Sequence, residues 1–169
     1  MLEDPQPDCW LHPSLKVGPS PIAGEGLFAT AAIPAGTVVS RLGGRLVTLD
    51  HLRDLFADPD VPYVDTITVT ADLHLVLPPG NRIGKSNHSC DPNLWWTGPY
   101  TLATRRDLRP GEEATNDYGT STTVADYTLD CLCGTALCRG RVTGEDWRRP
   151  ELQDRYGDHW IPALRTLMA

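Results

Sequence analysis

The sequence predicts a mainly β domain with several small sheets, few short helices and a helical tail at its C-terminal end. Three observations support this fold class. Apolar residues alternate with polar ones in short runs, as in half-buried strands, and glycine and proline turns separate these runs. Helical spacing is confined to one internal segment and to residues 145–169. With 169 residues, 40% of them hydrophobic, the chain suits one compact domain with a small appendage.

The first strands are expected after a proline-rich opening. Residues 1–21 show no periodicity and predict an irregular arm, which Trp10 and Leu11 would hold on the surface. From Ile22 the chain becomes strand-like and punctuated by glycine, with a turn at 34–36. This pattern predicts a hairpin or meander.

The next segment predicts one helix and two strands. Leucine and phenylalanine recur at helical spacing from Thr48 to about Phe56, and either Thr48 or Asp50 can cap the helix. Residues 63–77 then alternate apolar and polar side chains, with a turn near residues 71–72. A strand pair is therefore expected after the helix.

A further strand pair is predicted at residues 94–96 and 100–103, before a turn at 109–112. The tail, residues 145–169, has a broadly helical rhythm that we expect Pro150 and Pro162 to interrupt. Its aromatic residues are interpreted as core or lid residues rather than a ligand site. They are Trp147, Tyr156 and Trp160.

The charge of the chain restricts its partners. A net charge of -7 and a pI near 5.1 argue against binding to nucleic acid, because phosphate backbones are bound mainly by lysine and arginine. A basic peptide is the better electrostatic match. No apolar run approaches the ~20 residues of a membrane-spanning helix, and the first residues are acidic, unlike a secretory signal. We therefore expect an intracellular, cytoplasmic protein that binds no membrane.

The cysteines indicate a metal site. Cys131, Cys133 and Cys138 lie within eight residues, one ligand short of the tetrahedral set of structural zinc. Cys90 is the candidate for the fourth ligand because it lies in a polar run, and His88 is the alternative. The other interpretations are buried thiols without a metal, or a redox pair with a third cysteine nearby.

Four segments, in this order, resemble those of the SET-domain protein lysine methyltransferases, and the resemblance extends from about residue 24 to residue 140. It implies a SET (β-clip-like) fold of several small sheets with a pseudoknot. The implied organisation is a SET domain at 22–120 with an insert at about 46–79, a post-SET zinc segment at 121–144 and the tail at 145–169. The four segments are Gly24-Glu25-Gly26-Leu27-Phe28-Ala29 with Ile33-Pro34-Ala35-Gly36; Asn87-His88-Ser89-Cys90-Asp91-Pro92-Asn93; Gly111-Glu112-Glu113 through Asp117-Tyr118-Gly119; and Cys131-Leu132-Cys133-Gly134 through Cys138-Arg139-Gly140.

The resemblance also implies site residues. It makes Cys90 the fourth ligand of one structural zinc and Tyr118 the catalytic tyrosine, which would orient the acceptor amine. Without the order of the four motifs, Tyr118 would be interpreted as a turn residue. Tyr63 is either a substrate-channel residue or a half-buried strand residue. Asn87 and His88 are either cofactor contacts or a structural hydrogen-bond cluster, and we expect both roles. The implied S-adenosylmethionine site comprises Glu25, Gly26, Leu27, Asn87, His88, Tyr118 and Leu132.

Three departures from the family pattern bear on the substrate. Asn116 stands where an aromatic residue usually influences the number of methyl groups added, so we include it among the catalytic candidates. Residues 84–86 are Gly-Lys-Ser instead of Arg-Phe-Ile, and Leu42 replaces a common aromatic residue. Because the insert is short, substrate specificity is expected to depend on the tail or on a partner.

The leading hypothesis is an S-adenosylmethionine-dependent N-methyltransferase that acts on the ε-amine of a lysine in a protein or peptide, which we expect to be basic. Two alternatives remain. One is a methyltransferase for a small amine, which the compact insert would permit. The other is a catalytically inactive, zinc-stabilised binding module, in which Asn116 and the 84–86 change have altered the channel.

Overall fold

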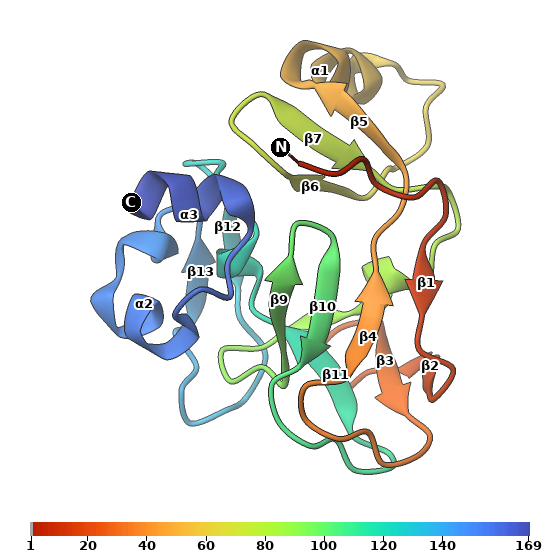
Figure 1. The fold of residues 1–169 in the computed structure, drawn as a ribbon, viewed down its shortest axis with the longest axis vertical. Helices are drawn as coiled ribbons and strands as arrows, with labels where there is room; N and C mark the ends of the chain where they lie inside the picture. Colours follow the sequence, from red (N-terminus) through yellow and green to blue (C-terminus); the bar gives the residue numbers. More distant parts are fainter. Residues whose placement is uncertain (1) are drawn as a thin grey trace.

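The structure of this chain is a computed structural model that describes residues 2–169 (Figure 1). It confirms a mainly β fold of several small sheets with few short helices. The strands are β1 (Trp10–Leu11), β2 (Leu15–Pro19), β3 (Glu25–Ala29), β4 (Val38–Arg41), β5 (Arg45–Thr48), β6 (Thr66–Thr68), β7 (Leu73–Val76), β8 (Asn87–His88), β9 (Leu94–Gly98), β10 (Thr101–Thr104), β11 (Glu113–Asn116), β12 (Thr128–Asp130) and β13 (Arg141–Thr143). The helices are α1 (Leu49–Ala57), α2 (Pro150–Tyr156) and α3 (Pro162–Met168), with 3-10 turns η1 (Ile83–Lys85), η2 (Tyr118–Thr120) and η3 (Asp146–Arg148).

The strands of residues 2–169 form four sheets, in the orders β1-β4-β10-β9, β2-β3-β11-β8, β5-β7-β6 and β12-β13. β8 runs parallel to β11, with Asn87 opposite Thr115 and His88 opposite Asn116. This pairing brings the polar segment 87–93 against the strand that leads to Tyr118. Two of the four segments singled out in the sequence therefore lie side by side.

The sheet β5-β7-β6 and helix α1 form a separate layer at the top of the molecule (Figure 1). The N-cap of α1 is Thr48, whose hydroxyl accepts a hydrogen bond from the backbone N–H of His51 at 3.3 Å. Leu52 of α1 packs with Val47 and Val76 against the sheet. The predicted helix and the strand pair that follows it are both confirmed, although β6 is short.

Two expectations about the first 40 residues are wrong. β3 and β4 do not form a hairpin, because β3 pairs with β2 and β11 whereas β4 pairs with β1 and β10. The connection between them makes a bridge from Ile33 to Leu108 and carries the chain to another sheet. Residues 1–21 are also not irregular throughout, since β2 pairs with β3 along its whole length. Backbone pairing requires no apolar periodicity, so the side-chain pattern did not predict it.

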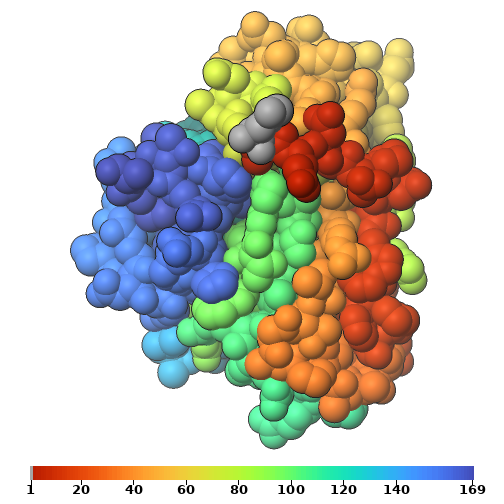
Figure 2. Space-filling model, viewed as in Figure 1, coloured from red at the N-terminus to blue at the C-terminus, as the bar shows by residue number. Residues whose placement is uncertain are grey.

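The tail packs as a helical layer beside β9, and Figure 2 shows it (blue) against the green surface of the sheet. Pro150 and Pro162 do not interrupt helices but occupy their first positions, where the missing N–H costs no hydrogen bond. His159 stacks on Trp95 with ring centroids 3.4 Å apart. The tail supplies Leu152, Tyr156, Trp160, Ile161, Ala163 and Leu164 to the larger hydrophobic core.

Among residues 2–169 there is no helix with the length and apolar character to cross a membrane.

Candidate active site and metal centre

The four predicted zinc ligands converge on one point. The Sγ atoms of Cys90, Cys131, Cys133 and Cys138 all lie within 4.8 Å of one another, and those of Cys90 and Cys131 are 3.6 Å apart. Tetrahedral zinc with four thiolates places its sulfur atoms about 3.8 Å apart, so the donor set fits this metal. The structure brings Cys90 into the cluster in preference to His88.

The loop between β12 and β13 shapes this cluster. The backbone N–H of Cys131 donates to the Gly140 carbonyl at 2.8 Å and closes the loop at its base. The N–H of Arg139 donates to Cys90 Sγ at 3.3 Å, and that of Gly140 donates to Cys138 Sγ at 3.4 Å. Such donors stabilise thiolates, the form in which cysteine binds metal.

Arg139, next to the last cysteine, joins a buried charge network. Its guanidinium donates to both carboxylate oxygens of Asp117, at 2.7 and 2.8 Å, and to Asp146 at 3.0 Å. The Tyr156 hydroxyl donates to the same Asp117 carboxylate at 2.8 Å. Burial alone would raise the pKa of Asp117, but the Arg139 guanidinium and the Tyr156 hydroxyl hold it below its usual value. The zinc segment and the tail are thereby fixed to the residue before Tyr118.

His88 connects the cysteine cluster to Tyr118 directly. Its Nδ1 accepts a hydrogen bond from the backbone N–H of Tyr118 at 3.1 Å, which places the ring proton on Nε2. Nε2 lies 3.3 Å from Cys90 Sγ and can donate to it. Burial lowers the pKa of His88, in agreement with a neutral ring. One imidazole therefore contacts both a predicted metal ligand and the backbone of the predicted catalytic residue.

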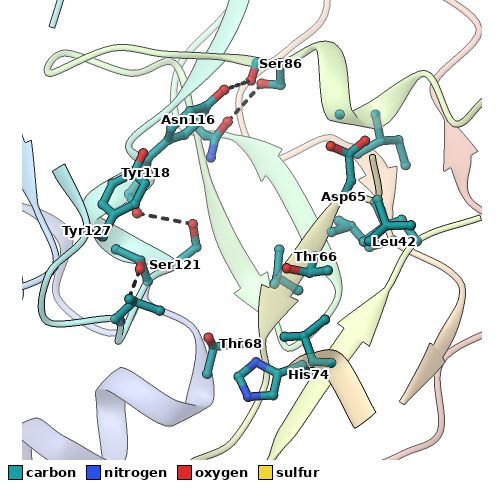
Figure 3. Close-up of a pocket in the computed structure, with 18 of the residues that line it drawn as sticks. Leu42, Asp65, Thr66, Thr68, His74, Ser86, Asn116, Tyr118, Ser121 and Tyr127 are labelled. Atoms are coloured by element: carbon teal, nitrogen blue, oxygen red, sulfur yellow. Dashed lines mark hydrogen bonds between the residues drawn. The ribbon is translucent and has the colours of Figure 1, made fainter. Parts of the chain in front are cut away.

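A cavity of about 510 Å³ lies in front of Tyr118, between the β5-β7-β6 layer and residues 121–127 (Figure 3). The Tyr118 hydroxyl donates to the Ser86 carbonyl at 2.7 Å. Burial raises the pKa of Tyr118 to about 12, so the phenol keeps its proton near neutral pH. Tyr118 can orient a substrate but is a poor general base.

Asn116 lies beside Tyr118 on the same cavity wall. Its Oδ1 accepts from the Ser86 hydroxyl at 2.9 Å, and its amide nitrogen points into the cavity (Figure 3). Ser86 therefore contacts both residues, through its carbonyl and its hydroxyl. Two of the departures noted in the sequence, at residues 84–86 and at Asn116, form one hydrogen-bonded unit.

The structure separates the two interpretations of Tyr63. Tyr63 lies outside the strands and 89% of it is exposed, so it is not a half-buried strand residue. It lines the cavity, and its role in a substrate channel stays a prediction. Tyr127, which sequence reasoning missed, is half-buried and lines the cavity from the post-SET side. No spacing rule connects Tyr127 to the other site residues.

Apart from Tyr118, the residues predicted to bind S-adenosylmethionine lie outside the lining of this cavity. Gly26 fits a backbone contact, because a Cβ on it would overlap the Glu113 carboxylate. Leu27 is part of the core and can contribute only its backbone, whereas Leu132 is 69% exposed and free to cover a ligand. Glu25 forms an ion pair with Lys85 at 2.9 Å. These residues fit the proposed cofactor in residue type and backbone geometry.

Known proteins with similar sequences are methyltransferases by name. The family model described as SET domain matches residues 24–119. The histone-lysine N-methyltransferase ash1 of Drosophila melanogaster is 29% identical over 74% of this chain. The H3 lysine-4 specific histone-lysine N-methyltransferase of Mycosarcoma maydis is 32% identical over 74% of it. The matched region spans only 6% and 9% of these two relatives.

Among solved structures, the methyltransferase domain of human histone-lysine N-methyltransferase SETMAR is similar to this chain. The TM-score is 0.60 at 23% sequence identity, and the match covers 79% of this chain and 58% of that one. This likeness shows a shared fold.

Proposed function

This chain belongs to the SET domain family, and from that premise we propose that it is an S-adenosylmethionine-dependent N-methyltransferase acting on the ε-amine of a protein lysine. The observation that supports this most strongly is the position of Tyr118. Tyr118 lines the cavity, and its backbone N–H donates to His88, which adjoins both the predicted cofactor residue Asn87 and the predicted metal ligand Cys90. Acceptor, cofactor and metal sites would thus meet within a few residues.

The chemistry requires little of the protein beyond alignment. S-adenosylmethionine supplies a methyl group on a positively charged sulfur, which leaves as a neutral thioether. The lysine must be neutral to attack, and an apolar cavity lowers the pKa of a buried amine. Tyr118, bonded to the Ser86 carbonyl, would hold the amine in line with the methyl group. Because the phenol stays protonated, the lysine proton would leave to solvent.

The charge of the segment that contributes to one wall of the cavity supports a basic acceptor segment. Residues 49–65 contain five aspartates and one arginine, and Asp65 and Arg53 line the cavity. An acidic segment attracts lysine-rich and arginine-rich peptides and disfavours acidic ones. The aspartates are Asp50, Asp54, Asp58, Asp60 and Asp65.

One contact favours a small amine as the second candidate acceptor. The hydroxyls of Thr68 on β6 and Thr123 in the post-SET segment lie 3.5 Å apart and join the two sides of the cavity. A peptide would have to separate them, whereas a small molecule would not.

A radiolabelled-methyl assay of cell lysate with zinc-loaded protein tests the proposal. We expect label on lysine residues of protein, and Tyr118→Phe should lower its rate of appearance about 100-fold because alignment is lost. Tyr100→Phe, which removes a buried phenol hydroxyl that has no partner within the described residues and lies outside the cavity lining, is the matched control and should lower the rate by less than about threefold. Label confined to small molecules would exclude the protein acceptor. Absence of both label and cofactor binding would leave only a binding module.

A further inference from the structure

Glu113, on β11, occupies the place where the segments predicted to bind the cofactor meet. The Ser20 hydroxyl shares its one proton between the two carboxylate oxygens, at 2.8 and 2.9 Å, and Asn87 Nδ2 donates to the carboxylate at 2.9 Å. It fills the space beside Gly26 that a side chain would otherwise take. Ser20, Gly26 and Asn87 belong to three different segments, and Glu113 contacts all of them.

The Asn87 amide is held in one orientation. Its Nδ2 donates to the carbonyls of Ala23 and Glu25, both at 3.0 Å, and to Glu113 at 2.9 Å. An amide nitrogen has two protons, and these three acceptors leave neither proton free for another partner. Within residues 2–169, Asn87 Oδ1 receives no donor and is not enclosed. Asn87 therefore offers a free acceptor on the side away from Glu113.

The charge of Glu113 is also uncompensated. Its neighbour Glu112 pairs with Arg106 at 2.6 Å, and Glu25 pairs with Lys85 at 2.9 Å. Among residues 2–169, no cationic side chain lies within 4 Å of the Glu113 carboxylate, whose partners are neutral. A half-buried carboxylate without a counter-ion favours the approach of a cation. The amino-acid end of S-adenosylmethionine carries such a cation, its α-ammonium.

We propose that Glu113 is a positioning residue for the α-ammonium of S-adenosylmethionine. By accepting from Nδ2 it fixes Asn87 Oδ1 as the acceptor for the ammonium, and its negative charge favours that group nearby. The inference rests on the proposed function, since it requires that the chain bind this cofactor. It assigns a role to a residue that belongs to the third motif but was not among the predicted site residues.

The test is calorimetry of the zinc-loaded full chain with two probes, S-adenosylhomocysteine and its analogue that lacks the α-amino group. Wild-type protein should bind the parent about 10- to 100-fold more tightly than the analogue, as expected for a hydrogen bond to a charged group. Glu113→Ala should weaken binding of the parent by a similar factor and change the affinity for the analogue by less than about twofold. The effect of removing the Glu113 carboxylate and the effect of removing the α-amino group would then be coupled rather than additive.

Two further variants separate positioning from folding. Glu112→Gln changes the neighbouring acid, whose cation is Arg106, and should leave both affinities unchanged. Glu113→Gln keeps an oxygen for Asn87 and Ser20, so it should fold even if Glu113→Ala does not, and should still weaken the parent selectively. Equal weakening of both probes, or none, would overturn the proposal. If wild-type protein binds neither probe, the proposed function itself fails.

Discussion

The two walls of the cavity are held by different kinds of contact. The tyrosine wall, formed by Ser86, Asn116 and Tyr118, is tied through buried hydrogen bonds and the Asp117–Arg139 ion pair to the metal cluster and the tail. The insert wall, formed by Thr66, Thr68 and His74, has few polar contacts, and His74 Nε2 is buried without a partner. From this difference we infer that, in the proposed function, the tyrosine wall holds the reacting groups and the insert wall contacts the acceptor.

The largest expected effect comes from removing the metal from the tyrosine wall. Chelation or Cys131→Ser should release residues 121–144, because the binding energy of a structural zinc is also folding energy. Metal analysis should find one zinc per chain in wild type, and hydrogen exchange should show loss of protection in that segment without it. Cys9→Ser is the control, since Cys9 is a free thiol outside the cluster. An unchanged zinc content in Cys131→Ser would contradict the assignment.

The next largest effect is expected from breaking the Asp117–Arg139 ion pair. Asp117→Asn leaves Arg139 without its bidentate partner and should cost about 3–5 kcal/mol of unfolding free energy, measured with denaturant. The corresponding change on the insert side, Asp65→Asn, affects a single hydrogen bond from Asn81 and should cost about 1 kcal/mol. Equal costs would remove the distinction between the two walls.

The same carboxylate predicts the direction of the pH dependence. The pKa of Asp117 is lower in the folded than in the unfolded chain, so its contribution is complete above the unfolded pKa of about 3.9. It is lost as the pH falls through the folded pKa. Acid titration followed by circular dichroism should therefore show wild-type protein losing stability below about pH 4 more steeply than Asp117→Asn. Parallel curves would show that Asp117 does not contribute.

The smallest expected changes in the free energy of unfolding come from single polar groups, and they should have opposite signs on the two walls. His74→Leu replaces an unpartnered buried nitrogen with apolar atoms and should stabilise the protein by about 1 kcal/mol. Ser86→Ala should destabilise it by about 1 kcal/mol, because Asn116 Oδ1 loses its donor. Thermal unfolding measures both. Destabilisation by His74→Leu would show that the ring makes contacts that its hydrogen bonding does not reveal.

The sequence predicted best those features that depend on short motifs. The cysteine spacing led to the metal cluster, and the helical pattern with Thr48 led to α1. It did not predict which sheet β3 and β4 would join, because strand partners are chosen by distant backbone groups. Nor did it predict the Arg139–Asp117 pair, because a buried charge looks like a surface charge until its partner, 22 residues away, is known.

The five residues from Ser86 to Cys90 limit how the protein can be engineered. Within this stretch lie a contact to Tyr118 and Asn116, the free acceptor of Asn87, the imidazole that reaches Tyr118, and a predicted metal ligand. Insertion of a single residue here would move all four out of register at once. A chimaera that exchanges substrate preference should therefore replace residues 45–76 and leave this stretch, with β11, untouched.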